Sequence, residues 1–353
     1  MTAVHQFHPV LAPGDAMSDH VFALRDRLRE WGHVAEAYAI EAKPGVAHDV
    51  LPYRRLFRTV RPEDMLILHY SMGNEVFDQL VKIDARRVLV YHNVTPPEFF
   101  TGVNPHAAAS ARLGQRRLGE LAPRIDLAIG VSEYNTRELA ARGFERTATV
   151  PILIDWSRFA TAPDEAVLRA WSGPGTKLLF VGRISPNKRQ DELIRLLAYY
   201  RRCIDPAAQL ILVGAYRDQP QYHHRLHALA RAIGVDGAVT FTGPVSVAEL
   251  VAYYRSASVF VSLSEHEGFG IPLLEAMYHG LPVIALDRAA VGETMAGAGV
   301  LVPDKNIPAI AELCALVLER PALREALVAA GRRRVEDFAS DRVAARTREV
   351  LGL

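Results

Sequence analysis

Several features that mark specialised classes of protein are scarce or missing in this sequence. Only two of its 353 residues are cysteines, Cys203 and Cys314, and neither belongs to a C-x-x-C pair. Two isolated cysteines cannot build a disulfide framework, so we expect a reducing, cytoplasmic location. Neither charge sign is in excess, because 41 lysines and arginines nearly balance 40 aspartates and glutamates. Nucleic-acid-binding proteins usually have a strong basic excess, so no nucleic-acid partner is expected.

Long apolar runs are also missing. The sequence has no uninterrupted apolar stretch of the roughly 18 residues that a membrane-spanning helix needs. Its first residues lack the charged segment and apolar run of a secretory signal, which again favours the cytoplasm. Hydrophobic residues nevertheless make up 50% of the chain, which excludes an intrinsically disordered protein and predicts a large buried core.

The motifs of two common nucleotide-binding classes are absent. No G-x-G-x-x-G follows the first apolar run, which disfavours a dehydrogenase. No G-x-x-x-x-G-K-[ST] is present, which excludes a P-loop protein.

Short apolar runs alternate with helix-length amphipathic segments along the chain. Runs such as LLFV, LILV and VFVSL are apolar at successive positions, which is typical of parallel strands buried on both faces. Met17–Trp31 ends at Gly32, and Pro272–His279 begins with proline and ends at Gly280, as helices commonly do. We expect strands at Ala3–His8, Val34–Ile40, Met65–His69, Arg87–His92, Leu127–Ser132, Thr147–Ile154, Lys177–Val181, Gln209–Val213, Ala238–Thr242, Val259–Leu263, Pro282–Leu286 and Gly299–Val302.

This alternation predicts an α/β fold of two doubly wound, Rossmann-like domains that face each other across a cleft. The chain is too long for one hydrophobic core, and the strand rhythm breaks between residues 155 and 175. We expect an N-terminal domain over residues 1–160, a ligand-binding C-terminal domain over 161–335, and a C-terminal helix over 336–353 that packs back on the N-terminal domain. Ligands of such folds bind beyond the carboxyl ends of the strands.

One loop at such a strand end carries the strongest motif, EGFGIPLLE, from Glu267 to Glu275. Gly268 and Gly270 let backbone N–H groups approach an anion, and the dipole of a helix that begins at Ile271 favours phosphate there. The two carboxylates are suited to holding sugar hydroxyls. On these residues alone, an ordinary turn followed by a solvated Glu275 carries equal weight.

A second loop, GRISPNK over Gly182–Lys188, follows the strand KLLFV. Arg183 offers a planar fork for phosphate oxygens, and Lys188 adds a point charge close by. Two solvated cations on a loop are the commoner arrangement of such a pair, and this alternative stays open at this point.

The chain resembles family 4 retaining glycosyltransferases of the GT-B fold, the glycosyl transferases group 1 of bacterial polysaccharide synthesis. The resemblance rests on Gly182–Lys188, on YYRSASVFVSLSEHEGFGIPLLEAMYHGLPVIA (Tyr253–Ala285) and on the later GETMAGAGVLVP. Glu267 and Glu275 hold the family's Glu-x7-Glu spacing. The resemblance covers most of residues 175–305 and extends more loosely to GVSEYNTRELAARGF (Gly130–Phe144).

The resemblance implies a hexosyltransferase that moves a sugar such as mannose or glucose, with retention, from a nucleotide-diphosphate donor to a glycan or lipid-linked glycan. No cofactor is implied beyond this donor substrate. Arg183 and Lys188 would bind the diphosphate, Glu267 the sugar hydroxyls and Glu275 the ribose. The residues implied in donor binding are Gly14, Arg183, Lys188, Val245, Glu267, Gly268, Phe269, Gly270, Ile271 and Glu275. Those implied in catalysis are Arg183, Lys188, Glu267 and His92.

The N-terminal half matches the family less closely. His92 corresponds to the histidine that approaches the donor sugar, but His69 ends a neighbouring strand, so the choice between them is open. The first loop reads LAPGDA (Leu11–Ala16) in place of Gly-Gly, and Asp15 is unusual beside a diphosphate. The linker reads Pro151–Leu153 in place of Pro-Asn-Gly. Both departures concern the acceptor side, which the N-terminal domain is expected to supply.

Three remaining features complete the expectations. No D-x-D occurs, so we expect metal-independent turnover and no metal ligands. His223 and His227 stand four residues apart without a third ligand, so a solvated helix face is expected there. The basic stretch Arg112–Arg124 is also expected to be a solvated face, the alternative being peripheral contact with the cytoplasmic face of the inner membrane.

Two other functions are compatible with this architecture. One is a sugar-nucleotide 2-epimerase, and the other is a non-catalytic sugar-nucleotide-binding protein. The presence of Arg183, Lys188 and both glutamates favours sugar transfer over these alternatives.

Overall fold

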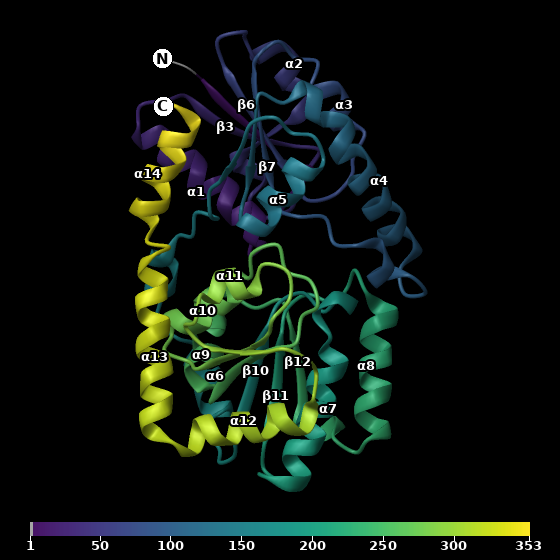
Figure 1. The fold of residues 1–353 in the computed structure, drawn as a ribbon, viewed down its shortest axis with the longest axis vertical. Helices are drawn as coiled ribbons and strands as arrows, with labels where there is room; N and C mark the ends of the chain where they lie inside the picture. Colours follow the sequence, from purple (N-terminus) through teal and green to yellow (C-terminus); the bar gives the residue numbers. More distant parts are fainter. Residues whose placement is uncertain (1–2) are drawn as a thin grey trace. The chain divides into compact units, whose positions relative to one another are not determined.

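The computed structural model describes residues 3–353 and divides the chain into two compact units. The N-terminal unit comprises the residues up to Thr101, Pro105–Trp156 and Phe338–Leu353. The C-terminal unit comprises Gly102–Asn104 and Ser157–Asp337. Each unit surrounds its own parallel sheet with helices (Figure 1). Among the helices of residues 3–353, none combines the length and the apolar character that crossing a membrane requires.

The N-terminal unit contains a seven-stranded sheet in the order β5-β3-β1-β6-β7-β8-β9. Every neighbouring pair is parallel, and the order changes direction between β1 and β6, which is the switch point of this sheet. A separate small sheet pairs β2 (Val10–Leu11) with β4 (Glu41–Ala42). The main strands are β1 (Val4–Phe7), β3 (Ala35–Ala39), β5 (Val50–Pro52), β6 (Met65–Tyr70), β7 (Arg86–Tyr91), β8 (Leu127–Gly130) and β9 (Thr147–Thr149).

The helices of the N-terminal unit begin at recognisable caps. The side chain of Asp15 accepts a hydrogen bond from the N–H of Ser18 at 3.1 Å and caps the first helix. Gly14 precedes this cap with a φ of +68°, a conformation that glycine adopts readily. The helices are α1 (Ala16–Glu30), α2 (Leu56–Thr59), α3 (Val76–Leu80), α4 (Pro105–Leu121), α5 (Glu133–Ala141) and α14 (Ser340–Leu351).

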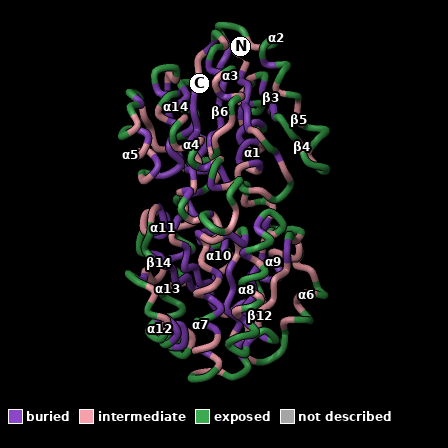
Figure 2. The backbone as a smooth tube through the Cα atoms, turned by 90° about the vertical axis from the view of Figure 1, so that its right-hand side faces the viewer, coloured by how far each residue is buried: buried purple, intermediate pink, exposed green. Residues whose placement is uncertain are grey.

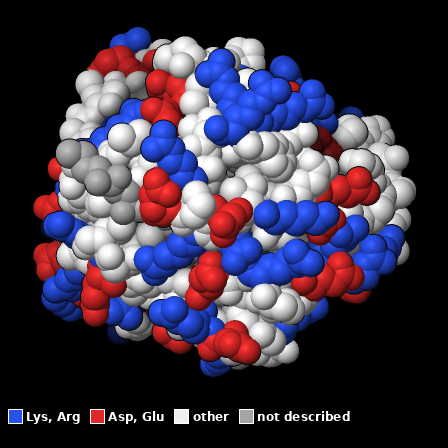
Figure 3. All heavy atoms as spheres, turned by 90° about the horizontal axis from the view of Figure 1, so that it is seen from above, with Lys and Arg blue, Asp and Glu red and all other residues white. Residues whose placement is uncertain are grey.

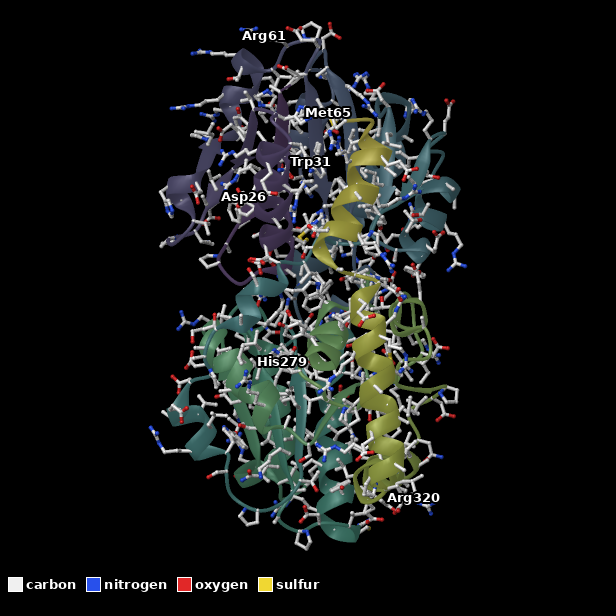
Figure 4. All side chains as sticks on the ribbon, turned by 90° about the vertical axis from the view of Figure 1, so that its left-hand side faces the viewer. Asp26, Trp31, Arg61, Met65, His279 and Arg320 are labelled. Atoms are coloured by element: carbon white, nitrogen blue, oxygen red, sulfur yellow. The ribbon has the colours of Figure 1, made fainter. Side chains whose placement is uncertain are left out.

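The last helix, α14, packs on the N-terminal unit, as expected from the sequence. Its residues Val343 and Ala344 form a buried cluster with Leu153. The guanidinium of Arg348 lies 5.6 Å from the ring centre of Trp31, which Figure 4 shows beside this helix. The linker residue that replaces the family's glycine, Leu153, is therefore part of the core that holds α14.

The C-terminal unit contains a six-stranded parallel sheet in the order β12-β11-β10-β13-β14-β15, with its switch point between β10 and β13. The strands are β10 (Lys177–Val181), β11 (Gln209–Val213), β12 (Val239–Gly243), β13 (Val259–Ser262), β14 (Val283–Leu286) and β15 (Val300–Val302). The helices are α6 (Glu165–Ala170), α7 (Gln190–Cys203), α8 (Pro220–Ala232), α9 (Val247–Ser256), α10 (Ile271–Tyr278), α11 (Val291–Met295), α12 (Ile307–Glu319) and α13 (Pro321–Glu336).

The strands form the core of both units. All residues of β1, β6, β13 and β14 are buried, and Figure 2 shows burial concentrated along the sheets. This is the burial expected of parallel strands covered by helices on both faces. The predicted α/β fold of two doubly wound, Rossmann-like sheets is confirmed, and each expected strand is present, although β9 is shorter than predicted. The edge strand β5 and the small β2–β4 sheet were not predicted.

Candidate functional site

The loops that follow β10 and β13 lie side by side at the switch point of the C-terminal sheet. The side-chain N–H of Asn187 donates a hydrogen bond to the carbonyl of His266 at 3.1 Å. The N–H of Glu265 donates to the carbonyl of Asn187 at 2.8 Å. Asn187 is buried, so these bonds hold the two loops against each other. The structure thus brings together the two motifs that the sequence singled out.

Glycines set the path of the loop that carries Arg183. A Cβ atom on Gly214, which has a φ of +143°, would clash with the carbonyl oxygen of Gly182. The N–H of Ile184 donates to the carbonyl of Ala215 at 2.8 Å. Only glycine allows this approach of the loops after β10 and β11.

Lys188 and Glu267 form an ion pair across the two loops. The Nζ atom of Lys188 lies 2.6 Å from Oε2 of Glu267, and the two side chains are only 19% and 15% exposed. An ion pair shielded from water is stronger than an exposed one. The ammonium group has three N–H donors, so one bond to Glu267 leaves donors for an anion.

The neighbouring His266 does not add a charge to this site. Burial, together with the nearby charge of Lys188, lowers the pKa of His266 to about 4. Its imidazole is therefore neutral at pH 7, and Lys188 supplies the positive charge at this point of the loop.

Arg189 is a functional candidate that the sequence did not reveal. Its backbone is left-handed (φ +52°, ψ +44°), which costs a residue other than glycine about 1–2 kcal/mol. Its guanidinium lies 2.9 Å from Asp191, 2.8 Å from Glu192 and 3.0 Å from Glu265. The hydrogen bonds to Asp191 raise the pKa of Arg189 above its usual range. These contacts stabilise the strained turn directly after Lys188 and attach it to the β13 loop.

The turn at residues 268–271 opens helix α10. Gly270 caps the helix with a φ of +96°. The Oγ1 hydroxyl of Thr294 donates to the carbonyl of Phe269 at 2.5 Å and anchors the turn to α11. The start of a helix carries a partial positive charge, so an anion is favoured beside this turn. The residues expected in donor binding at 268–271 all lie here.

Val245 lies in the loop after β12 and is half-buried. The preceding Gly243 has a φ of +73°, and its carbonyl accepts a hydrogen bond from the N–H of Gly214 at 3.2 Å. The loop after β12 is thereby joined to the loop after β11.

Glu275 is buried, which contradicts the alternative that it is a solvated helix position. Its side chain is 6% exposed. Its Oε1 accepts from a guanidinium N–H of Arg158 at 3.3 Å, and its Oε2 accepts from the hydroxyl of Tyr254 at 2.8 Å. These bonds tie α10 to α9 and to the segment before α6.

Arg183 forms an ion pair with Asp218. Its Nη1 is 3.5 Å from a carboxylate oxygen of Asp218, and both side chains are about half exposed (49% and 47%). Its carbonyl accepts from the side-chain N–H of Gln190 at 3.1 Å, which holds the loop but leaves the guanidinium exposed. An exposed pair of this kind contributes little to stability.

The remaining candidates, His92 and Gly14, belong to the N-terminal unit. His92 follows β7, is half-buried, and its Nε2 lies 3.0 Å from Nδ1 of the buried His69 in β6. The two histidines between which the sequence could not choose are therefore in contact. Gly14 and Asp15 form the cap of α1.

Two groups of histidines have the composition of metal sites. His223 and His227 are half-buried on α8: their rings pack on Phe241, and His223 stacks on Tyr216 with ring centres 4.1 Å apart. In residues 3–353, only His20, His69 and His92 form a group of three whose potential ligand atoms all lie close enough to hold a metal ion, within 4.8 Å.

Comparison with known proteins gives a family match and several relatives. Residues 169–334 match the family model described as glycosyl transferases group 1. The chain is 31% identical over 257 residues to a D-inositol 3-phosphate glycosyltransferase of Kineococcus radiotolerans, covering 67% of this chain and 59% of that protein. It is 33% identical over 237 residues to a GDP-mannose-dependent α-(1-6)-phosphatidylinositol monomannoside mannosyltransferase of Mycobacterium tuberculosis, covering 63% of this chain and 59% of that protein. The chain thus spans less than two thirds of these relatives.

Solved structures match over nearly the whole chain. HepE of Anabaena, in complex with UDP and glucose, has a TM-score of 0.78 and 18% identity, and 100% of each chain is covered. Sucrose-phosphate synthase from Thermosynechococcus elongatus has a TM-score of 0.77 and 20% identity, with 99% of this chain and 98% of that chain covered. At these identities the similarity shows the fold, which is that of the GT-B glycosyltransferases.

Proposed function

Residues 169–334 of this chain belong to the glycosyl transferases group 1 family, and on this basis we propose that the protein is a retaining hexosyltransferase. It transfers a sugar such as mannose or glucose from a nucleotide-diphosphate donor to a glycan or lipid-linked glycan acceptor in the synthesis of a cell-surface polysaccharide. The observation that carries the proposal is the Lys188–Glu267 ion pair, which two loops of the C-terminal sheet hold beside the start of α10.

The C-terminal unit is suited to stabilise the leaving nucleotide. Breaking the bond between the sugar and the diphosphate develops negative charge on the phosphate and positive charge on the sugar ring. Lys188, Arg183 and the start of α10 offer positive charge to the phosphate, and groups fixed before the reaction do this without reorganising. Glu267, held by Lys188, accepts hydrogen bonds from hydroxyls of the transferred sugar.

Arg183 and Glu275 contribute in different ways. Arg183 exchanges Asp218 for a phosphate oxygen when the donor binds, and this exchange is inexpensive because the existing pair is exposed. Glu275 accepts hydrogen bonds from Arg158 and Tyr254, and these bonds keep its carboxylate in place. A carboxylate is an acceptor, so it suits a ribose hydroxyl of the donor.

The acceptor is a hydroxyl group of a glycan or another polyol. The two relatives described above are a D-inositol 3-phosphate glycosyltransferase and a phosphatidylinositol monomannoside mannosyltransferase, and their acceptors support this class. The leaving phosphate takes the proton of the attacking hydroxyl on the same face of the sugar, so the configuration is retained and no separate protein base is required. The reaction takes place in the cytoplasm.

Product analysis tests this function. The full chain is incubated with GDP- and UDP-linked hexoses and with inositol phosphate or short glycan acceptors, and nucleotide diphosphate release is followed together with product masses. We expect release coupled to the mass of one added hexose, with retained anomeric configuration by NMR. Lys188→Ala should lose this activity, and Lys82→Ala, which changes an exposed lysine, should keep it.

The two alternatives give different products. A 2-epimerase converts the donor without adding mass to any acceptor. A non-catalytic protein binds the donor and consumes none of it. Either result contradicts the proposed transfer.

We further propose peripheral contact with an anionic membrane through the segment Arg54–Arg61 and not through α4. In α4, Arg117 pairs with Asp78, and Arg116 lies 4.0 Å from Glu120, so part of its charge is neutralised.

Residues 54–61 carry unneutralised charge next to apolar surface. Arg54, Arg55, Arg58 and Arg61 are exposed and have no carboxylate partner in the part of the chain that the structure describes, and Phe57 is 45% exposed. Figure 4 shows Arg61 at the top of the view, and Figure 3, which is seen from above, shows one group of lysine and arginine side chains on a face that also carries acidic ones. A basic surface with an exposed aromatic ring is suited to anionic lipid headgroups.

A further inference from the structure

Four histidines gather at the carboxyl edge of the N-terminal sheet, around its switch point. His8 follows β1, His69 lies in β6, His92 follows β7 and His20 lies on α1. The ring centre of His20 is 5.5 Å from those of both His69 and His92. His8, His20 and His69 are buried, and His92 is half-buried. The hydrogen bonds around this cluster define which nitrogen of each ring carries the proton.

The side-chain amide of Gln6 in β1 determines which nitrogen of His69 carries the proton. The carbonyl of Val21 can only accept, so Gln6 must present its side-chain NH₂ to it, at 3.1 Å. The amide oxygen of Gln6 therefore faces Nε2 of His69, at 2.9 Å. An amide oxygen can only accept, so the proton of His69 is on Nε2.

The position of the proton on His69 then determines the position of the proton on His92. Burial, followed by the influence of the neighbouring histidines, lowers the pKa values of His69 and His92 well below the usual range, so both rings are neutral at pH 7. A neutral His69 with its proton on Nε2 has a lone pair on Nδ1, which accepts from Nε2–H of His92 at 3.0 Å. The Nδ1 atom of His92 is consequently a lone pair. It is buried and has no hydrogen-bond partner within residues 3–353.

The same reasoning argues against a metal ion in this cluster. The N–H of Leu153 donates to Nδ1 of His20 at 2.9 Å, and burial lowers the pKa of His20 to about 4. A neutral His20 that accepts at Nδ1 carries its proton on Nε2 and has no lone pair left for a metal. The Nδ1 lone pair of His69 is already used by His92, so three ligands are not available together.

We propose that Gln6 and His69 are positioning residues that lock His92 in the Nε2–H form, so that its Nδ1 accepts a hydrogen bond from a hydroxyl group of the substrate. This inference rests on the proposed transferase function and specifies the chemistry of its N-terminal side.

The orientation selects one class of ligand group. A buried acceptor without a partner is costly, and a group that donates a hydrogen bond removes this cost. A sugar hydroxyl can donate a hydrogen bond to the lone pair of Nδ1. An ionised phosphate or carboxylate has no proton to donate, so its oxygen lone pairs would face the lone pair of Nδ1 and repel it. The histidine therefore recognises a hydroxyl of the substrate and disfavours phosphate at the same position.

The protonated nitrogens can be observed directly in the full chain. In long-range ¹H–¹⁵N spectra of histidine-labelled protein at pH 7.5, protonated and unprotonated ring nitrogens resonate far apart. We expect His69, His92 and His20 to be neutral and protonated at Nε2. A proton on Nδ1 of His92, or displacement of these protons when zinc is added, overturns the proposal.

Two sets of variants test the consequence for turnover. Gln6→Leu removes the acceptor that fixes His69, and we expect mixed tautomers and a ~10-fold lower kcat/KM, the effect of one positioned hydrogen bond. At position 92, asparagine places its amide near the lost Nδ1 and glutamine places it near the lost Nε2. His92→Asn should therefore retain more activity than His92→Gln. His106→Ala, at an exposed position of α4, is the control and should have unchanged activity.

Deoxy substrates identify the hydroxyl that is recognised. We expect wild-type protein to discriminate ~10-fold or more against one donor or one acceptor that lacks a single hydroxyl, and His92→Ala to lose this discrimination. If this discrimination is seen with a deoxy donor, His92 contacts the donor, and if it is seen with a deoxy acceptor, His92 contacts the acceptor. Equal discrimination by wild type and His92→Ala at every hydroxyl overturns the proposal.

The outcomes separate this inference from the proposed function. A protein that transfers sugar but has another tautomer at His92 retains the function and refutes the inference. A protein that has the expected tautomers but transfers nothing refutes both the transferase proposal and the substrate contact.

Discussion

The ammonium of Lys188 lies 2.6 Å from the carboxylate of Glu267, so each side chain holds the other beside the start of α10. Lys188→Ala removes a cation aimed at the diphosphate and leaves a mostly buried carboxylate without its partner. We expect kcat/KM to fall by ~10²–10³-fold, as for the loss of one preorganised charge-stabilising group. Glu267→Ala should also impair turnover while the protein stays folded. Steady-state kinetics with circular dichroism measure both effects, and near-full activity of the two variants contradicts the assignment.

The buried carboxylate of Glu275 predicts an effect on stability. Tyr254→Phe removes the hydroxyl that donates to Oε2, and we expect unfolding to become easier by about 1.5–3 kcal/mol, the usual range for a hydrogen bond to a charged group. Urea unfolding of the ligand-free protein measures this change. Tyr53→Phe is the control, because the hydroxyl of Tyr53 has no hydrogen bond within residues 3–353. Equal midpoints for both variants would show that the Glu275 contact contributes nothing.

The close approach of Gly214 to Gly182 predicts a change in ligand binding. Gly214→Ala places a methyl group against the carbonyl of Gly182, so the loop that carries Arg183 must move. We expect the thermal stabilisation by GDP or UDP to be largely lost and the free energy of unfolding to fall by about 1–3 kcal/mol. Gly237→Ala, where a Cβ atom meets nothing within 4 Å, should change neither quantity by more than about 0.5 kcal/mol. Unaltered nucleotide binding in Gly214→Ala argues against a role for this loop.

Chelation tests the expected independence of metal. The sequence has no D-x-D, and in the N-terminal unit the hydrogen bonds of His20 and His69 occupy the lone pairs that a metal would need. We expect turnover to be the same, within about twofold, in EDTA and after re-addition of Mg²⁺, Mn²⁺ or Zn²⁺, because Lys188 and Arg183 supply the charge that a metal provides elsewhere. Loss of activity in EDTA that Mg²⁺ or Mn²⁺ restores contradicts this expectation.

Vesicle cosedimentation tests the membrane surface. We expect the full chain to bind vesicles that contain anionic phosphatidylglycerol and not vesicles of phosphatidylcholine alone. Reversing two charges in Arg54→Glu/Arg58→Glu should weaken binding by ~10-fold or more, since each basic residue near an anionic surface contributes about 1 kcal/mol. Arg112→Glu/Arg116→Glu is the matched variant on α4. If only the α4 variant loses binding, the membrane contact lies on α4. If the wild-type chain does not bind the vesicles that contain phosphatidylglycerol, the membrane proposal is wrong.

The strands could be predicted because parallel strands that are covered on both faces appear in the sequence as short runs of consecutive apolar residues. Runs such as LLFV are apolar at every position, since Leu178–Phe180 are buried and Val181 is half-buried. The edge strand β5 (Val50–Pro52) was missed because it is short, exposed on one side and ends in proline. The positions of the loops after β10 and β13 at the strand ends could also be predicted, because glycine and charge at strand ends are local signals.

The partners of the site residues could not be predicted, because they come from distant parts of the chain. Glu275 is buried with Arg158, which is 117 residues earlier. Arg189 contacts Glu265, which is 76 residues later. The link from Gln6 to His69 joins residues 63 positions apart. Only the packing of the strands brings these side chains together, so a solvated arginine and a buried one look the same in the sequence.

The return of α14 to the N-terminal unit has a consequence for the order in which the protein is made. The C-terminal unit is complete once Asp337 has left the ribosome, whereas the N-terminal unit still lacks α14. Until then, the apolar surface around Leu153 and Trp31 has no cover. The unit that is synthesised first is therefore finished last. A chain that stops before residue 338 damages the N-terminal unit and leaves intact the unit from which α14 extends.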